Sequence, residues 1–252
     1  MKNIENALVI LAGGNGSRFG KKLPKQFTQI NGENLIHFFL KSIDLKNFDK
    51  IVIVCKISYF KHLKKLEHNF PSVKFIFTQA GKDRQSSSYN ALKCLKIFNP
   101  NYVLIHDAAR PFCSNNLIIK ILKSLKKNSS AIPYIVNTDK KMILKKDFNQ
   151  NIKLIQTPQG FKFQTIFEAH KNTLIKNARD DSSLITEEKM NFVKGEKFNY
   201  KITYADDLHY FKLFLKPIFK SGIGYDIHQI DTKTKKGLKL CGVKINYNKL
   251  IG

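Results

Sequence analysis

The chain has 252 residues, with 44 Lys and Arg against 19 Asp and Glu, which gives a formal net charge of +25. This length suits one large α/β domain, or one domain with part of another. No N-terminal segment resembles a signal peptide and no apolar run is long enough to span a membrane, so we expect a cytoplasmic protein. The basic residues are mostly lysine and have no dense block, which favours a solvated surface over a nucleic-acid interface. Such a field would still attract a small anionic substrate.

The cysteines are scattered without a close pair: Cys55, Cys94, Cys113 and Cys241. Three of them lie in or beside apolar runs, which indicates buried free thiols in a reducing compartment.

The first predicted strand, 7–11, runs into a glycine-rich loop, Leu11–Gly20, that is followed by Pro24-Lys25-Gln26. Exposed backbone N–H groups in such a loop can approach phosphates closely, and Arg18 and Lys25 would neutralise them. The glycine spacing fits neither a dinucleotide fingerprint nor a Walker A loop. We therefore expect another kind of nucleoside triphosphate site.

Apolar strand patterns then alternate with amphipathic helix patterns, which predicts βαβ units and a mainly parallel sheet with helices on both faces. The expected strands are 7–11, 50–55, 73–78, 102–106 and 131–136, and the expected helices are 34–43, 58–69, 85–98 and 114–127, the last capped by Ser114. Ligands of such sheets bind beyond the carboxyl ends of the strands. The polar segments after strands, 13–25, 81–88 and 106–110, should therefore meet at one edge.

Two of these segments carry further candidate residues. In 81–88, Ser87 and the helix N-terminus can hold a base or a phosphate, although simple capping by Asp83 or a serine explains the pattern as well. In 106–111, Asp107 can bind Mg²⁺ or a ribose and Arg110 can grip a phosphate. A single histidine at a strand end, such as His106, is more often structural than catalytic.

The chain has only four arginines, Arg18, Arg84, Arg110 and Arg179. In a lysine-rich chain an arginine indicates a site that needs a planar, forked guanidinium. Three of the four lie in the segments described above.

After the fifth strand the pattern becomes polar and lysine-rich from 137 to 156, which favours a protruding hairpin. Helices follow at 163–176 and 182–189, then a strand at 200–204 and a helix at 206–216 that Pro217 ends. A new alternating apolar segment begins at Gly222.

The motifs now resemble a known family. Leu-Ala-Gly-Gly-Asn-Gly-Ser-Arg at 11–18, Pro-Lys-Gln at 24–26, His-Asp-Ala-Ala-Arg-Pro at 106–111, Gln-Thr-Pro-Gln at 156–159 and Lys-Ile-Thr at 201–203 occur in the order found in 2-C-methyl-D-erythritol 4-phosphate cytidylyltransferases. The resemblance implies a Rossmann-like transferase domain over 1–217. It would join CTP and methylerythritol phosphate into CDP-methylerythritol with release of pyrophosphate, using Mg²⁺, in non-mevalonate isoprenoid synthesis.

The resemblance also implies roles for individual residues. Arg18, Lys25 and Lys201 would stabilise the transition state. The nucleotide would be held by Ala12, Gly13, Gly14, Gly16, Ser87 and Asp107, the last also a candidate Mg²⁺ ligand. The sugar phosphate would contact Arg110, Thr138 and Thr157. In the family, the segment near 137–156 is an arm exchanged across a homodimer.

Two positions depart from the family pattern. An Asp-Arg pair that precedes Thr-Pro-Gln is replaced here by Asp147-Phe148-Asn149, so the sugar-phosphate arginine is missing or a lysine such as Lys146 supplies the contact. The family has an acidic residue two places before the position of Arg84, where this chain has Lys82. The neighbouring Asp83 can compensate for it.

The tail from 218 to 252 resembles the opening of 2-C-methyl-D-erythritol 2,4-cyclodiphosphate synthase, the start of a second α/β domain. Asp226 and His228 stand two apart on an expected strand, so they would share one face and could bind Zn²⁺ or another divalent metal. We expect a fragment of a fused two-enzyme protein, with the family's third metal ligand beyond Gly252. The 252-residue chain should then form no cyclic diphosphate.

Two alternatives stay open from the sequence. A related enzyme that uses CTP with ribitol phosphate would share the loop and the His-Asp-Ala-Ala-Arg-Pro motif. A basic nucleic-acid-binding protein would instead show salt-dependent binding and no nucleotide turnover.

Overall fold

The computed structural model describes residues 4–14, 19, 23–137, 152–215, 238–240 and 243–245. The chain divides into two compact units, Met1–Phe214 and Leu215–Gly252, each of which is described by itself. In the second unit, β9 (Leu238–Leu240) pairs antiparallel with β10 (Val243–Ile245). No helix in the described ranges is long and apolar enough to cross a membrane.

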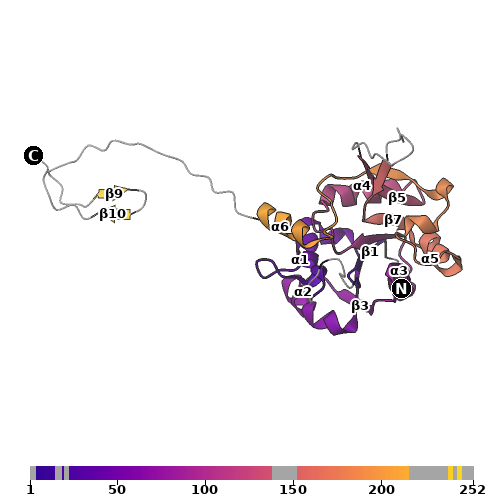
Figure 1. The fold of residues 1–252 in the computed structure, drawn as a ribbon, viewed down its shortest axis with the longest axis horizontal. Helices are drawn as coiled ribbons and strands as arrows, with labels where there is room; N and C mark the ends of the chain where they lie inside the picture. Colours follow the sequence, from indigo (N-terminus) through magenta and orange to yellow (C-terminus); the bar gives the residue numbers. More distant parts are fainter. Residues whose placement is uncertain are drawn as a thin grey trace, which may run out of the picture. The chain divides into compact units, whose positions relative to one another are not determined.

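The first unit is built on one eight-stranded sheet in the order β3-β2-β1-β4-β7-β5-β6, with β8 paired to β5 (Figure 1). The strands are β1 (Asn6–Leu11), β2 (Lys50–Cys55), β3 (Phe75–Gln79), β4 (Tyr102–Asp107), β5 (Ser130–Asn137), β6 (Ile152–Ile155), β7 (Gln159–Lys162) and β8 (Phe192–Lys194). The four strands from β3 to β4 are parallel, β7 runs antiparallel to β4, and β5 is antiparallel to both β7 and β6.

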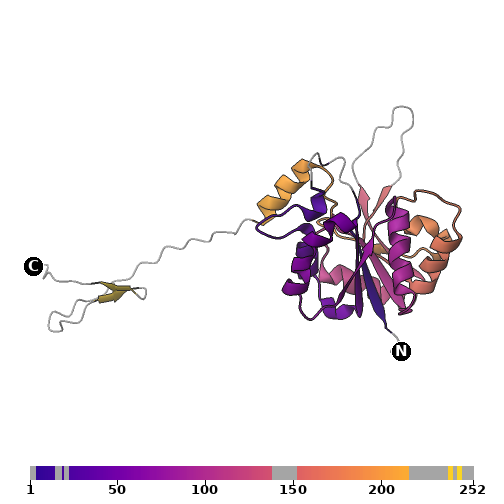
Figure 2. The ribbon, with the colours of Figure 1, turned by 90° about the horizontal axis from the view of Figure 1, so that it is seen from below.

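Helices cover both faces of the parallel part of the sheet (Figure 2). They are α1 (Leu35–Ser42), α2 (Lys64–Asn69), α3 (Arg84–Leu95), α4 (Asn115–Leu125), α5 (Phe163–Asn172) and α6 (Ala205–Phe214). In β1, Leu8 and Ile10 pack with α1 and α4, whereas Ala7 and Val9 pack with α3 and α5. A strand that is buried on both faces reads as a continuous apolar run, which explains why the sequence reveals β1 so clearly.

The predicted α/β class and the first five strands are confirmed, and Ser114 caps α4 by accepting the N–H of Leu117. Three of the expected elements differ from the structure. The helix expected at 58–69 is split into a 3-10 helix, Ile57–His62, and the short α2. The helix expected at 182–189 is two 3-10 turns, and the residues expected to form a strand at 200–204 form none. Strands β6, β7 and β8, each three or four residues long, were not predicted.

The polar segment at 137–156 is bounded by strands that pair with each other. Asn137 of β5 lies opposite Ile152 of β6 in an antiparallel register. The intervening residues, and with them Thr138, lie outside the described part of the chain. The register nevertheless shows that the chain leaves and re-enters the sheet at neighbouring points.

Candidate active site

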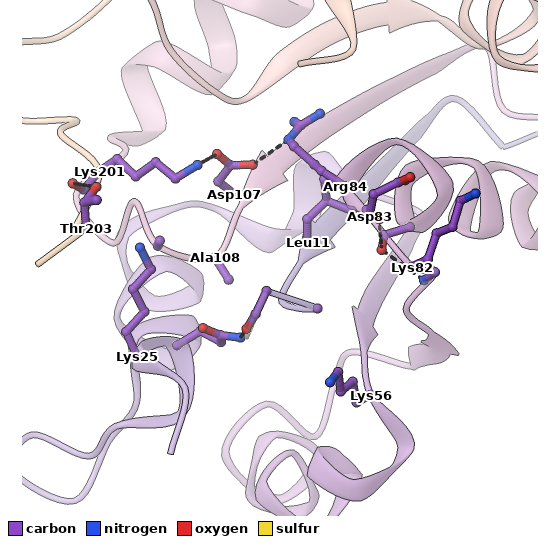
Figure 3. A pocket seen from close by; sticks show the side chains of 16 residues that line it. Leu11, Lys25, Lys56, Lys82, Asp83, Arg84, Asp107, Ala108, Lys201 and Thr203 are labelled. Carbon is purple, nitrogen blue, oxygen red and sulfur yellow. Dashed lines mark hydrogen bonds and ion pairs between the residues drawn. The ribbon is translucent and has the colours of Figure 1, made fainter. Parts of the chain in front are cut away.

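A pocket of about 470 Å³ opens where β1 and β4 end, at the sheet edge to which the sequence assigned the ligand (Figure 3). Among the described residues, its lining includes the basic Lys25, Lys56, Lys82, Arg84 and Lys201 and two acidic residues, Asp83 and Asp107. An excess of cations in a concave site at the carboxyl ends of strands suits a polyanionic ligand such as a nucleotide.

The backbone after β1 is shaped by Gln26, whose side-chain amide donates to the carbonyl oxygens of Ala12 and Gly14 at 2.7 Å each. Gln26 is buried and belongs to the 3-10 turn Lys25–Phe27. A Cβ atom on Gly13 would lie 2.5 Å from the Cβ of Ala80, so only glycine fits there. Gly13 and Gly14 both line the pocket, whereas Gly16 and Arg18 lie outside the described residues.

The start of α3 forms a second wall of the pocket. Asp83 caps the helix in a capping box with Ser86, so the capping interpretation of this segment holds for Asp83. Ser87 accepts the N–H of Gly81 at 3.0 Å and donates to the carbonyl of Asp83 at 2.7 Å, and it also lines the pocket. Ser87 therefore joins the loop to the helix at the surface where a ligand would bind.

Asp107 ends β4 and lies between two cations (Figure 3). Its carboxylate accepts from Lys201 Nζ at 2.7 Å and from Arg84 Nε at 3.2 Å. Burial alone would raise the pKa of Asp107, but Arg84 and Lys201 outweigh burial and hold that pKa well below its usual range. Asp107 is therefore an anion whose position is fixed by two cations.

Arg84 is shared between two carboxylates. Its Nη1 donates to Asp181 at 2.7 Å, in addition to the contact of its Nε with Asp107. Burial opposes the charged guanidinium, but the two carboxylates raise the pKa of Arg84 above its ordinary value. In this arrangement Arg84 neutralises buried acids at the wall of the pocket.

Lys25 and Lys201 come together through the segment 201–203. The ammonium of Lys25 donates to the carbonyl of Ile202, and the N–H of Ile202 donates to the carbonyl of Ala109 at 2.9 Å. Two residues that are 176 positions apart thus reach one pocket (201 − 25).

His106 lies behind this surface and is fully buried, with its ring stacked on Phe39 at 3.9 Å between centroids. Its Nε2 donates to the carbonyl of Arg110 at 3.0 Å. Burial lowers the pKa of His106 to about 3, so the ring is neutral near pH 7. This environment agrees with the structural role that the sequence favours for it.

Thr157 and Arg110 are not among the residues that line the pocket. The hydroxyl of the buried Thr157 accepts the N–H of Asp107 at 3.0 Å, so it supports the end of β4. The Arg110 guanidinium donates to the carbonyls of Asn199 at 2.6 Å and Ile155 at 3.5 Å, and burial lowers its pKa. Its buried Nε has no hydrogen-bond partner among the residues that the structure describes.

Sequence reasoning missed two contributors to the site. Gln26 belongs to the Pro-Lys-Gln motif at 24–26, but a glutamine side chain gives no local signal that it will bind the loop carbonyls. Asp181 lies in a polar stretch that reads as surface, although its side chain is only 1% exposed. A weak signal was available for Asp181, because a buried arginine needs acidic partners.

The model of the family described as 2-C-methyl-D-erythritol 4-phosphate cytidylyltransferase matches residues 6–216 of this chain. A similar protein from Pelagibacter ubique, "Bifunctional enzyme IspD/IspF", is 38% identical over 250 residues. The match covers 96% of this chain and 64% of that protein. A protein of the same description from Wolbachia pipientis wMel is 33% identical over 99% of this chain and 66% of its own length. The chain therefore spans slightly less than two-thirds of these two relatives.

Single-enzyme proteins and solved structures match as well. The 2-C-methyl-D-erythritol 4-phosphate cytidylyltransferase of Thermosipho africanus is 35% identical over 80% of this chain and 94% of its own length. The crystal structure of 4-diphosphocytidyl-2C-methyl-D-erythritol synthase from Anaerococcus prevotii superposes with a TM-score of 0.72 at 25% identity, covering 84% of this chain and 96% of that one. The structure of the bifunctional IspDF from Campylobacter jejuni superposes with a TM-score of 0.68 at 30% identity, covering 81% of this chain and 53% of that one.

Proposed function

This chain belongs to the 2-C-methyl-D-erythritol 4-phosphate cytidylyltransferase family, and on that premise we propose that it transfers CMP from CTP to 2-C-methyl-D-erythritol 4-phosphate. The products are CDP-methylerythritol and pyrophosphate, in non-mevalonate isoprenoid biosynthesis. The observation that supports the proposal best is the pocket at the ends of β1 and β4, where Lys25, Lys201 and Asp107 meet a glycine-rich backbone.

The reaction needs no protein nucleophile. A phosphate oxygen of methylerythritol phosphate attacks the α-phosphorus of CTP in line, a new P–O bond forms, and the bond to the departing pyrophosphate breaks. Negative charge grows on the phosphate oxygens as this happens, so fixed cations lower the barrier. In our proposal Lys25, Lys201 and Arg18 supply those cations.

The nucleotide would lie against the loop after β1 and the start of α3. Ala12, Gly13, Gly14, Gly16 and Ser87 are proposed to hold it, with Asp107 near the ribose. Gly13, Gly14, Ser87 and Asp107 line the pocket, which supports this assignment. For the sugar phosphate we propose Arg110, Thr138 and Thr157. Arg110 and Thr157 do not line this pocket, so the contacts proposed for them would lie beside it.

We propose that Asp107, whose carboxylate also accepts from Lys201 and Arg84, would hold a divalent cation, Mg²⁺. Mg²⁺ is usually held by one or two carboxylates together with substrate phosphates, and Asp107 is kept ionised at the pocket wall. When bound, the ion would neutralise charge on the triphosphate. No cluster of three or more His, Cys, Asp or Glu side chains that could hold a metal ion occurs in the described part of the chain.

The proposal extends to the rest of the protein. Residues 1–217 would form the transferase domain, which would form a homodimer in the cytoplasm through an arm at about 137–156. Residues 218–252 would begin a cyclodiphosphate synthase domain with Asp226 and His228 as ligands of Zn²⁺ or another divalent metal. These two residues lie outside the described ranges, so support comes from the bifunctional relatives.

The test is pyrophosphate release by the purified chain with CTP, Mg²⁺ and either methylerythritol phosphate or ribitol phosphate. We expect turnover with methylerythritol phosphate and at most a few per cent of that rate with ribitol phosphate. Both substrates carry a phosphate, so the enzyme discriminates between them through its contacts with the polyol part. Lys201→Gln should lower kcat by about 100-fold, since it removes a cation that acts on the transition state. No release with methylerythritol phosphate would refute the proposal, and faster release with ribitol phosphate would favour the alternative substrate.

A further inference from the structure

Four charged side chains of alternating sign lead from the pocket into the protein. Lys201 pairs with Asp107 at 2.7 Å, Asp107 with Arg84 at 3.2 Å, and Arg84 with Asp181 at 2.7 Å. Figure 3 shows the first three of them in line, with Asp107 between the two cations. Asp181 is the innermost member, because its side chain is 1% exposed whereas that of Lys201 is 40% exposed.

Asp181 is held rigidly by residues outside the pocket. His170 of α5 donates from Nε2 to its Oδ1 at 2.9 Å, which leaves Oδ2 for Arg84. The backbone N–H groups of Asp181 and Ser182 both donate to the side-chain oxygen of Gln159 at 3.1 Å. His170 is itself fixed, since its ring lies parallel to that of Tyr89, with an interplanar angle of 2°.

The distances indicate which partner orients Arg84. The contact of Arg84 with Asp181 is 0.5 Å shorter than its contact with Asp107 (3.2 − 2.7). A guanidinium is planar, so holding Nη1 on one acceptor restricts the directions in which Nε can point. The shorter contact therefore favours Asp181 as the partner that orients Arg84 toward Asp107, and Asp107 in turn meets Lys201.

We propose that Asp181 is a positioning residue for cytidylyl transfer, acting through Arg84 on the placement of Asp107 and Lys201. This inference rests on the proposed function. Asp181 is 1% exposed and is not among the described residues that line the pocket, so in this proposal it acts on the reaction through this chain of contacts and not by touching a substrate. Without the Asp181 charge, Arg84 has one carboxylate left to bind, and the geometry of Asp107 and Lys201 changes.

The test is the substitution Asp181→Asn, with Asp180→Asn as the matched control. Asp180 is the adjacent residue and also caps the turn, accepting from Ser182 Oγ at 2.6 Å and from Ser183 N–H at 3.0 Å, but it has no contact with Arg84. We expect Asp181→Asn to lower kcat by about 10- to 100-fold, the scale expected for misplaced catalytic groups. Its KM for CTP should rise by a smaller factor than kcat falls, about threefold or less, because Gly13, Gly14 and Ser87 keep their places and only the contact proposed for Asp107 with the ribose shifts. Asp180→Asn should keep the wild-type kcat.

A double-mutant cycle separates positioning from a general structural role. If Asp181 acts through Arg84, Asp181→Asn should lower kcat by less than about twofold in the Arg84→Lys background. There the guanidinium that joins Asp181 to Asp107 is already absent. The same 10- to 100-fold loss in both backgrounds would overturn the proposal, as would a rise in KM for CTP with unchanged kcat.

Folding and the underlying activity are controlled separately. Urea unfolding of each variant identifies loss of fold, and if Asp181→Asn fails to fold, His170→Phe replaces it. This variant keeps a ring against Tyr89 but removes the donor to Asp181, and we expect kcat to fall by about threefold or more. An unchanged kcat in His170→Phe would overturn the proposal in that case. A wild-type chain that releases no pyrophosphate would instead refute the proposed function.

Discussion

At the scale of single residues, the pocket depends on side chains that hold its backbone in place. Gln26 is the clearest case, because one buried amide binds two loop carbonyls at 2.7 Å each. Those carbonyls belong to Ala12 and Gly14, so the amide fixes the path of the backbone along which a triphosphate would lie. A residue that only shapes the loop should therefore influence nucleotide binding strongly.

We predict that Gln26→Glu weakens CTP binding and destabilises the protein. A carboxylate has nearly the same shape but cannot donate, so it would face two carbonyl oxygens without a proton to share. Two lost hydrogen bonds and a buried charge correspond to about 2–4 kcal/mol in the free energy of unfolding. Urea unfolding and the KM for CTP measure the two effects.

The control for this prediction is Gln164→Glu, the same chemical change at an exposed side chain that donates to Asn99 at 2.7 Å. Its free energy of unfolding should change by about 0.5 kcal/mol or less. Equal effects of the two substitutions would contradict the role of Gln26.

His106 gives a prediction for the pH dependence of stability. Its folded pKa of about 3 lies below the unfolded value, so the unfolded chain binds a proton more readily between these pH values. Stability should therefore fall as the pH drops below about 6.5, by at most about 1.4 kcal/mol per pH unit from this group. Asp107 and Asp181 also have lowered pKa values, but their stabilisation is lost only below about pH 4. Burial also lowers the pKa of His37, so the range from 6.5 to 4.5 reports on both buried histidines, and a His106 variant is needed to separate them.

We expect His106→Gln to be less stable than the wild type at pH 7.5 but to lose less stability between pH 6.5 and 4.5. The comparison is between urea unfolding curves recorded in buffers of constant ionic strength. The control is His209→Gln, at an exposed position of α6, whose free energy of unfolding should change with pH as that of the wild type does. A parallel curve for His106→Gln would show that the buried ring does not set this slope.

At the scale of elements, success from sequence followed burial. Strands β1, β2 and β4 are buried along five of their six positions, and their apolar runs were recognised with bounds within one residue. Strand β7 carries Gln159, Gly160 and Lys162, which resemble a loop, yet it lies between β4 and β5. Its state is decided by tertiary packing, since Gly160 lets α4 approach closely, and no local pattern encodes that approach.

The candidate site divides in the same way. Gly13, Gly14, Lys25, Ser87 and Asp107 could be predicted because their residue types follow strands, and these five residues line the pocket. The pairing of Arg84 with Asp181 spans 97 positions, and the support of Asp107 by Thr157 spans 50. Contacts of this length depend on the three-dimensional arrangement, so reading segments one at a time does not reveal them.

The packing of β7 on α4 leads to a prediction for Gly160→Ala. The new Cβ would lie 2.4 Å from Cγ2 of Ile121 and 3.0 Å from Cδ1 of Leu125, so α4 or the strand must shift. Overpacking of this kind costs about 1–3 kcal/mol in the free energy of unfolding. In the double variant Gly160→Ala with Ile121→Ala, the loss should be smaller than the sum of the two single losses. Additive losses in urea unfolding would contradict the close contact.

At the scale of the whole molecule, the net charge of +25 acts over a longer range than any contact in the pocket. Lysines are spread along the sequence, but at the pocket the basic lining residues Lys25, Lys56, Lys82, Arg84 and Lys201 outnumber the acidic ones five to two. A diffuse positive field together with a positive pocket should speed the encounter with a polyanion such as CTP. The chemical step depends instead on groups that are within a few ångströms of the phosphates.

This division predicts opposite responses to salt for the two kinetic parameters. Raising the ionic strength from 0.02 to 0.5 M shortens the screening length to about 4–5 Å, so the kcat/KM for CTP should fall by about tenfold or more. The kcat should change by less than about twofold, because the buried pairs around Asp107 are screened little. The measurement is initial-rate pyrophosphate release at saturating methylerythritol phosphate and constant free Mg²⁺.

Replacing Lys56 and Lys82 together by Gln should flatten the salt dependence of kcat/KM, whereas the same change at two lysines of α4, Lys120 and Lys123, should flatten it less. If kcat falls with salt as steeply as kcat/KM does, the cations act in the chemical step and long-range attraction is not the cause.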